Sequence, residues 1–283
     1  MSTFNRIELL FPYMRKMFGQ LQVSLNFYFY GKSHFTSTGY ATNAALYSLP
    51  TFHDTARLDD KVVLITGANA GIGKEMAKYA AKTGASVFMV CRTLSKAETA
   101  KEEIVKETGN SKVHVLQCDV SLEADVRRCW NEFESHESFK GKSPELHALV
   151  TNAGALLNEK TLTSEGVETT FAAHLLYGTH LLGKLAMPTL ERTIDSRLIM
   201  VSSGGMYNTK LPGWEIMAST HEKSDEKYDG NLAYAYAKRG QVVLAEKWAR
   251  DHPAVKVVST HPGWTLTEGV ESACVMRIDM LYV

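Results

Sequence analysis

The sequence predicts an α/β protein in which a doubly wound parallel sheet is covered by helices on both faces, in three αβα layers. From Lys61 onward, short apolar runs of strand length alternate with segments of helical length. Most of these runs are continuous rather than alternating, as expected of parallel strands that are buried on both faces. The six runs are residues 62–65, 87–90, 113–116, 146–150, 198–201 and 255–258.

The composition is that of an ordinary globular chain. Of its 283 residues 45% are hydrophobic, and 31 basic side chains balance 31 acidic ones, so charge gives no reason to expect a nucleic-acid partner. No apolar stretch reaches the roughly 18 residues that a membrane-spanning helix needs. The cysteines lie far apart without a C-x-x-C pair, so we expect reduced thiols in a cytoplasm-like compartment. They are Cys91, Cys118, Cys129 and Cys274.

Residues 1–57 form an N-terminal extension that has three interpretations. It is a docking arm that packs on the following domain, an interfacial segment, or a targeting sequence. Association with a membrane surface or with mitochondria therefore stays open beside a cytoplasmic location. Basic residues outnumber acidic ones through residue 50, with Arg6, Arg15, Lys16 and Lys32 against Glu8.

Helical spacing recurs between the apolar runs. One set of apolar residues follows the second run and another follows the third, at intervals of three and four residues. The charges among them, such as those at 101–103, would form a solvated helix face. The two sets are Leu94, Ala97, Ala100, Ile104 and Val105, and Val126, Cys129, Trp130 and Phe133.

The first apolar run leads directly into a glycine-rich turn, T-G-A-N-A-G-I-G at 66–73, and then into a helical pattern. This order is what a phosphate site in a Rossmann fold needs. Gly67 permits the tight turn, Gly71 lets backbone N–H groups approach a pyrophosphate, and Gly73 allows close packing of a helix whose positive end faces the anion. A purely structural glycine turn is the alternative. Asn69, Ala70 and Ile72 would complete the cradle.

The residue type that follows the second run predicts the cofactor. About 20 residues after the glycine turn, an NAD site presents an acidic side chain to the ribose, whereas this chain presents Arg92. A guanidinium matches a 2′-phosphate in geometry and charge, and Lys74 would supply a second cation. The predicted cofactor is NADP(H) rather than NAD(H). The alternative is that Arg92 only caps a strand end in solvent.

Asp119 ends the third predicted strand. There its carboxylate would accept a hydrogen bond from the adenine amino group. It would alternatively cap the next helix together with Ser121, and both roles are compatible.

Tyr234 and Lys238 are four residues apart in a helical stretch, 231–250, so both side chains lie on one helix face. A free tyrosine has a pKa of about 10, and a nearby ammonium lowers it toward neutrality. Ser203 follows the fifth run, where a hydroxyl can donate to a carbonyl oxygen or an alkoxide. An accidental pair on a surface helix is the alternative. Tyr236 gives the contrast, since no cation follows it four residues later.

Together these residues resemble the short-chain dehydrogenase/reductase family from Lys61 to about Val270. The G-x-x-x-G-x-G spacing is that of its compact form, and four further motifs match. The resemblance implies an oxidoreductase acting on a small-molecule carbonyl or alcohol, with homo-oligomerisation as a further implication. The motifs are T-N-A-G at 151–154, V-S-S-G-G at 201–205, Y-A-Y-A-K at 234–238 and H-P-G-W-x-x-T at 261–267.

The same resemblance assigns catalytic roles. Tyr234 is the proton donor and acceptor, Lys238 lowers the pKa of Tyr234 and holds the nicotinamide ribose, and Ser203 positions the substrate oxygen. Hydride passes between the nicotinamide and a carbon atom of the substrate.

The resemblance also assigns cofactor contacts. Asn152 and Gly154 would line the cofactor from the end of the fourth strand, and Pro262, Gly263 and Thr267 would flank the nicotinamide and its carboxamide. A plain turn is the structural alternative for Pro262 and Gly263.

One departure from the family pattern lies in the helix after the fourth strand. The family places an asparagine there, which supports a water that links the lysine to solvent, and this chain has His174. The imidazole either maintains the relay, as a fourth catalytic residue, or blocks the water site with its larger ring. A core histidine satisfied by backbone groups is the third interpretation. His174 and His180 are six residues apart rather than four, so we predict no helical zinc pair and no metal site.

A second departure concerns the end of the chain. After Thr267 the family continues with a substrate-covering segment, a helix and a seventh strand, whereas sixteen residues follow here. We therefore expect a nucleotide-binding domain over 58–270 that lacks the last strand, and a non-matching tail over 271–283.

Two classes of function follow. The leading hypothesis is an NADP(H)-dependent oxidoreductase that acts on a carbonyl or a secondary alcohol. Apolar neighbours of the predicted pocket indicate a lipophilic substrate. The alternative is a catalytically weak nucleotide-binding or interaction protein, which His174 and the short C-terminus favour. The apolar neighbours are Met206, Tyr207, Leu211 and Trp264.

Overall fold

The structure, a computed structural model, describes residues 22–23, 25–44, 57–218 and 228–265. These residues belong to two compact units. The smaller unit consists of the described residues up to 44 together with Gly263–Thr265, and the larger unit runs from residue 57 to Pro262. Each unit is described by itself.

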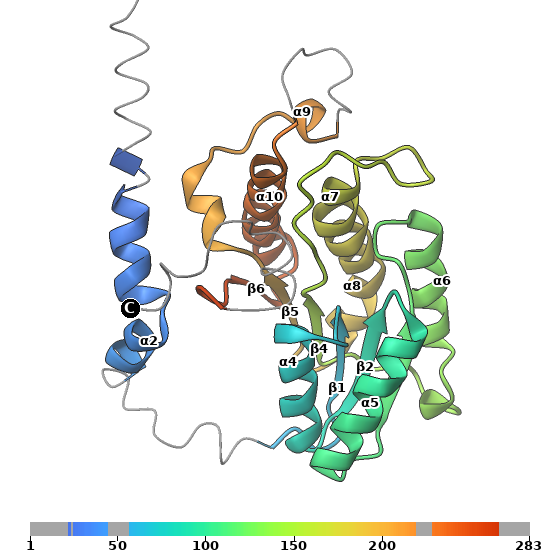
Figure 1. The fold of residues 1–283 in the computed structure, drawn as a ribbon. Helices are drawn as coiled ribbons and strands as arrows, with labels where there is room; N and C mark the ends of the chain where they lie inside the picture. The colour runs from blue at the N-terminus through green and yellow to red at the C-terminus, as the bar shows by residue number, and fades with distance from the viewer. Residues whose placement is uncertain (1–21, 24, 45–56, 219–227, 266–283) are drawn as a thin grey trace, which may run out of the picture. The chain divides into compact units, whose positions relative to one another are not determined.

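The larger unit is built on a six-stranded parallel sheet with the strand order β3-β2-β1-β4-β5-β6 (Figure 1). Each strand overlaps one of the predicted apolar runs, which confirms the predicted α/β class. The order reverses between β1 and β4, and ligands of such sheets bind at the carboxyl ends of the strands beside this switch point. The strands are β1 (Val62–Thr66), β2 (Ser86–Cys91), β3 (Val113–Gln117), β4 (Ala148–Thr151), β5 (Arg197–Val201) and β6 (Lys256–Thr260).

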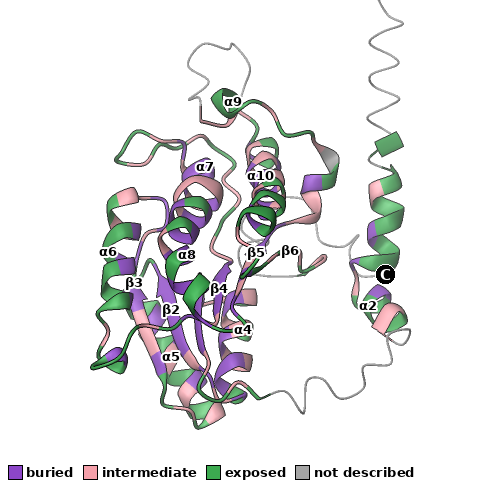
Figure 2. Cartoon of the chain, turned by 180° about the vertical axis from the view of Figure 1, so that it is seen from behind, coloured by how far each residue is buried: buried purple, intermediate pink, exposed green. Residues whose placement is uncertain are grey.

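Helices cover both faces of the sheet. One apolar layer joins Val63 and Ile65 of β1 to α4 (Gly71–Lys82) and α5 (Leu94–Thr108). A second layer joins the alternate strand residues to the helices of the opposite face. Figure 2 shows buried inner strands, such as β2 and β4, between helices whose outer sides are exposed. The helices of the second layer are α6 (Glu123–Glu134), α8 (Leu182–Arg192) and α10 (Gly230–Asp251).

The helix that precedes β5 changes its winding along its length. It begins as α7 (Thr169–Phe171), continues as the π-helix η3 (Ala172–Leu181) and ends as α8. None of the helices in the described part of the chain is long and apolar enough to cross a membrane. The remaining short helices are η2 (Glu137–Phe139), η4 (Gly204–Asn208) and α9 (Trp214–Ala218).

The smaller unit contains a helix over residues 25–34, the helix α2 (Ser37–Ala44) and an aromatic cluster. The centre of the Trp264 ring lies 6.1 Å from that of Phe27 and 6.2 Å from that of Phe35. The backbone N–H of Trp264 donates to the Phe35 carbonyl at 2.7 Å. The docking-arm interpretation, the domain boundaries and the lack of a last strand stay predictions, because residues 1–21, 45–56 and 266–283 lie outside the described residues.

Candidate active site

The turn between β1 and α4 has the geometry of a phosphate cradle. Gly67 and Gly71 have φ angles of 68° and 52°, in the left-handed region that favours glycine. A Cβ on Gly73 would lie 2.1 Å from the Gly67 carbonyl oxygen, so the helix start has no room for a side chain there. Helix α4 follows Ala70, which supplies no side-chain cap, and its first turn holds no acidic residue. Its amide groups can therefore bind an anion.

Asn152 holds this glycine turn from the end of β4. Its side-chain amide donates to the Thr66 carbonyl at 2.9 Å. The Thr66 hydroxyl in turn accepts the backbone N–H groups of Asn152 at 3.0 Å and of Ala153 at 2.9 Å. A Cβ on Gly67 would lie 2.9 Å from the Cα of Ala153, so the two segments approach as closely as glycine permits. Asn152 thus orders the cradle in which Asn69 and Ile72 also lie.

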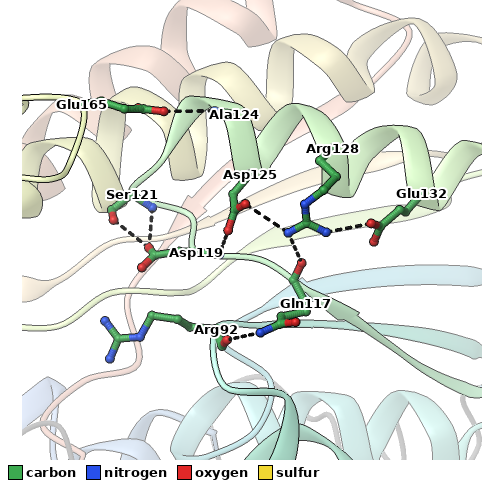
Figure 3. Close-up of polar contacts among 9 residues, drawn as sticks. All are labelled: Arg92, Gln117, Asp119, Ser121, Ala124, Asp125, Arg128, Glu132 and Glu165. Atoms are coloured by element: carbon green, nitrogen blue, oxygen red, sulfur yellow. Dashed lines mark hydrogen bonds and ion pairs between the residues drawn. The ribbon is translucent and has the colours of Figure 1, made fainter.

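Arg92 lies at the carboxyl end of β2, next to the strand that leads into the glycine turn (Figure 3). Its backbone carbonyl accepts a hydrogen bond from the Gln117 side-chain amide at 3.3 Å. Within the described part of the chain, the exposed guanidinium has no hydrogen-bond or ion-pair partner, and Figure 3 shows it pointing away from Gln117. Lys74, the second cation suggested by the sequence, pairs with Glu103 of α5 instead. Among the described residues, Arg92 is therefore a cation without a partner at this end of the site.

Asp119 follows β3 and forms a tight turn with Ser121 (Figure 3). Its Oδ1 accepts the backbone N–H of Ser121 at 3.0 Å and the hydroxyl at 2.7 Å. The alternative role of helix cap is wrong, because α6 starts at Glu123 and the N–H groups of Glu123 and Ala124 donate to the carboxylate of Glu165. Asp119 keeps its place at a strand end, where an adenine contact is predicted.

Three predicted catalytic residues meet at the carboxyl end of β5. The Nζ of Lys238 lies 5.6 Å from the centre of the Tyr234 ring. Ser203 follows β5 and precedes η4, and its hydroxyl lies near enough to Tyr234 to lower the pKa of that phenol. Lys238 is only 3% exposed and donates to the carbonyl of Val201 at 2.7 Å. This bond fixes the ammonium beneath the tyrosine ring.

Burial dominates the proton equilibria of this group. It lowers the pKa of the Lys238 ammonium to about 7, because the charged form loses its hydration. Burial also raises the pKa of Tyr234, and the nearby Ser203 hydroxyl partly offsets that rise. The pKa of Tyr234 is thus raised and not lowered toward neutrality as the sequence predicts, because desolvation is its largest cause.

His174 lies against both the tyrosine and the T-N-A-G segment. Its ring meets that of Tyr234 edge-on, with centroids 5.1 Å apart and an interplanar angle of 83°. A Cβ on Gly154 would lie 2.0 Å from the Cε1 of His174, so only glycine leaves room for the imidazole. The Nε2 lies 2.8 Å from the carbonyl oxygen and 3.1 Å from the amide nitrogen of Ala155. Burial and the charge of Lys238 lower the pKa of His174 to about 3, so the ring is neutral.

The last predicted cofactor segment is only partly placed. Pro262 follows β6 in the larger unit. Gly263, whose φ is 79°, belongs with Trp264 to the smaller unit, and Thr267 lies outside the described residues. Of the three predicted contacts, only Pro262 is described in the same unit as Tyr234.

Sequence reasoning missed three residues of the site. Thr66 orders the start of the T-N-A-G segment. Cys91 places its thiol against the backbone N–H groups of Ala68 and Asn69, and burial raises its pKa to about 11, so it stays protonated. Gln241 donates to the backbone carbonyl of His174 at 2.8 Å. Its only sequence signal is its position, three residues after Lys238 in the predicted helix.

The fold and the site define a dinucleotide-binding α/β protein with a serine, a tyrosine and a lysine at its centre. The family model described as short chain dehydrogenase matches residues 61–275, and the chain belongs to this family of oxidoreductases. It is 40% identical over 246 residues to "Dehydrogenase/reductase SDR family member 12" of Homo sapiens, which covers 86% of this chain and 72% of that protein. Segments 31–40, 202–206 and 238–244 already indicate this narrower likeness.

A further relative belongs with this family, and two solved structures share the fold. Retinol dehydrogenase 11 of Homo sapiens is 33% identical over 226 residues, covering 79% of this chain and 67% of that protein. A short-chain dehydrogenase from Sphingobium yanoikuyae in complex with NADPH aligns with a TM-score of 0.60 at 20% identity, over 79% of this chain and 78% of that one. A 7α-hydroxysteroid dehydrogenase complexed with NADH also aligns at 0.60, with 23% identity over 80% and 79% of the two chains. The two structures confirm the Rossmann-like fold, and their cofactors differ.

Proposed function

We propose that this protein is an NADP(H)-dependent oxidoreductase that interconverts a carbonyl and a secondary alcohol on a lipophilic small molecule. The observation that carries the proposal is the convergence of Ser203, Tyr234 and Lys238 at one strand end, next to the switch point of the sheet. A proton donor, a hydroxyl that orients an oxygen and a buried cation are the groups that carbonyl reduction requires.

The residues present fit a dinucleotide. The crowded glycine turn and the uncapped start of α4 suit a pyrophosphate. The guanidinium of Arg92, which has no partner in the part of the chain that the structure describes, suits a 2′-phosphate, and this supports NADP(H) over NAD(H). Asp119 lies where it would accept from the adenine amino group. When bound, the nicotinamide supplies or accepts the hydride.

The side chains of the site would orient the substrate and transfer the proton. Ser203 would orient the substrate oxygen, and Tyr234 would deliver a proton to that oxygen or remove one. Lys238, held by Val201, would stabilise the phenolate that results, because its charge lies beneath the ring. His174 would pack behind the tyrosine and keep a neutral ring there.

A lipophilic substrate is part of the proposal. Apolar side chains are exposed along η4 and α9, which follow the strand end that carries Ser203, and Trp214 is 67% exposed. Apolar surface next to a polar reactive centre suits a ligand with one oxygen on a hydrocarbon body. The names of a retinol dehydrogenase and a hydroxysteroid dehydrogenase among the matches support the same substrate class. The exposed residues are Tyr207, Leu211, Trp214 and Ile216.

A location in the cytoplasm and assembly into a homo-oligomer are also part of the proposal. The cysteines described by the structure, Cys91, Cys118 and Cys129, are free thiols, which supports the cytoplasm or another reducing compartment. Light scattering after size exclusion would test homo-oligomerisation.

The test of the activity is NADPH turnover against a panel of aliphatic aldehydes and ketones of increasing chain length. We expect Tyr234→Phe to reduce turnover by about 100-fold or more while cofactor affinity changes less than about twofold, because only the transferable proton is removed. Tyr236→Phe, two residues away on the same helix, is the matched control and should keep its activity. Full activity of Tyr234→Phe would refute the catalytic assignment.

A second candidate function is nucleotide binding with weak catalysis. One observation favours it, namely the imidazole that fills the space against Gly154 at the position of the family's asparagine. Tight NADPH binding without turnover on any carbonyl of the panel would support this candidate.

A further inference from the structure

The helix that carries His174 is wound unusually at that residue. Residues Ala172–Leu181 form a π-helix inside a longer helix, and π-helical turns are rare and concentrated at functional sites. A Cβ on Gly178 would lie 1.9 Å from the carbonyl oxygen of Ala173, so the wide turn depends on a glycine five residues after Ala173. Something must hold this winding, because an α-helix is the ordinary alternative.

Two buried side chains, those of Thr179 and Gln241, donate hydrogen bonds to the His174 carbonyl. The Thr179 hydroxyl donates to it at 2.7 Å, and the Gln241 side-chain amide donates to it at 2.8 Å. The second N–H of the same amide donates to the Thr179 oxygen at 3.0 Å. All three residues are 1% exposed, so water does not substitute for these bonds at the surface. Loss of one donor leaves buried polar groups unpaired.

The bonds connect two parts of the candidate active site. Gln241 lies on α10, three residues after Lys238 and seven after Tyr234, and this spacing places all three on one helix face. Helix α10, which carries Tyr234 and Lys238, is therefore also hydrogen-bonded to the π-helical turn that carries His174.

The hydrogen bonds from Gln241 and Thr179 to the His174 carbonyl fix the position of the imidazole through the backbone of His174. Because the ring has Gly154 against one side and meets Tyr234 edge-on, a change of winding would move it out of this slot. The Nδ1 is buried and has no partner among the described residues. A hydrogen on Nε2 satisfies the Ala155 carbonyl at 2.8 Å but gives up the Ala155 N–H as a donor to the ring. The other tautomer lets Nε2 accept that N–H at 3.1 Å, but it leaves both a buried Nδ1–H and the Ala155 carbonyl without this bond, so the Nε2–H tautomer satisfies more of the buried groups. Nδ1 is then a bare acceptor beside the active site.

We propose that Gln241, together with Thr179, is a positioning residue that holds the π-helical turn, and so keeps the His174 ring edge-on to Tyr234 in the Nε2–H tautomer. The effect on catalysis rests on the proposed oxidoreductase function. The effect on the histidine itself does not.

The test uses long-range proton–nitrogen NMR of the full chain labelled at histidine nitrogens, which distinguishes the two neutral tautomers. The His174→Asn spectrum assigns the His174 signals. We expect a single Nε2–H tautomer in the wild type and a mixture or a shifted signal in Gln241→Leu, which keeps the bulk and removes both donors. His147 is the internal reference. Its Nδ1 accepts the Val62 N–H in a hydrogen bond of 3.1 Å, and neither residue belongs to this site. Its signals should not move.

Thr179→Val is the second variant, for the case in which Gln241→Leu does not fold. It removes the other donor to the same carbonyl and should disturb the same histidine signals. In NADPH turnover, both variants should lower kcat about tenfold with less than about a twofold change in NADPH affinity, because the cradle is untouched. Gln241→Glu keeps the shape without the two N–H donors and should behave like Gln241→Leu.

Unchanged His174 signals in a folded variant would overturn the proposal, whatever the activity. A wild type without turnover would instead refute the proposed function and leave the NMR result to decide the positioning role.

Discussion

Replacing Lys238 with methionine should stabilise the protein at neutral pH. The ammonium is 3% exposed, and burial lowers its pKa from 10.5 to about 7. In the unfolded chain the lysine stays protonated up to about pH 10. Between pH 7 and 10 the unfolded state thus binds more protons than the folded state, and stability rises with pH.

The magnitude follows from that difference in pKa. A fall in the pKa from 10.5 to about 7 destabilises the folded state by about 5 kcal/mol. This destabilisation acts in full below pH 7 and disappears above pH 10.5. At pH 8 nearly one proton distinguishes the two states, so the slope is about 1 kcal/mol per pH unit. Lys238→Met removes this slope, at the cost of about 1 kcal/mol for the lost bond to Val201.

The assay is urea unfolding of wild type and Lys238→Met at pH 7, 8 and 9, followed by far-ultraviolet circular dichroism. The unfolding free energy of the wild type should rise across this range relative to that of the variant. This window avoids the titration of His174, whose folded pKa of about 3 affects stability only below its unfolded value of 6.5. Parallel curves for the two proteins would show that Lys238 keeps an ordinary pKa and would refute the reasoning.

Three further predictions test the cofactor site and the histidine. Arg92→Asp should weaken NADPH binding about tenfold or more and leave NADH binding unchanged or tighter, since an anion replaces the guanidinium; equal dissociation constants before and after the change would make Arg92 a surface residue. Gly73→Ala should destabilise the fold by about 1–3 kcal/mol and weaken NADPH binding, because the added Cβ meets the Gly67 carbonyl at 2.1 Å; thermal melting and cofactor titration measure both effects, and a wild-type result would contradict the described turn. His174→Asn should lower the unfolding free energy by about 1–3 kcal/mol, since it removes buried ring contacts and the bond to Ala155; chemical denaturation checks this, and unchanged stability would contradict the packing of the ring.

The sequence by itself determined the layers of the fold and the approximate place of the centre. Each predicted apolar run overlaps a strand, because an unbroken apolar run suits a strand buried on both faces; β6, last in the strand order, is the exception, since Val258 is 47% exposed. The predicted helix 231–250 became α10, which carries Tyr234 and Lys238 one turn apart. These features depend on periodicity and on neighbouring residues, and both are visible in a single sequence.

Only the tertiary structure decided which groups face one another. The sequence predicts Lys74 as a second cation for the 2′-phosphate, but the packing of α4 on α5 pairs it with Glu103. The local order of residues likewise gives no sign that Asn152 holds the glycine turn or that Gln241 grips the His174 carbonyl. Those bonds join residues 86 and 67 positions apart, so they exist only once the sheet and its helices bring the segments together. Burial acts in the same way, because the pKa of Lys238 falls through loss of water that no sequence spacing reports.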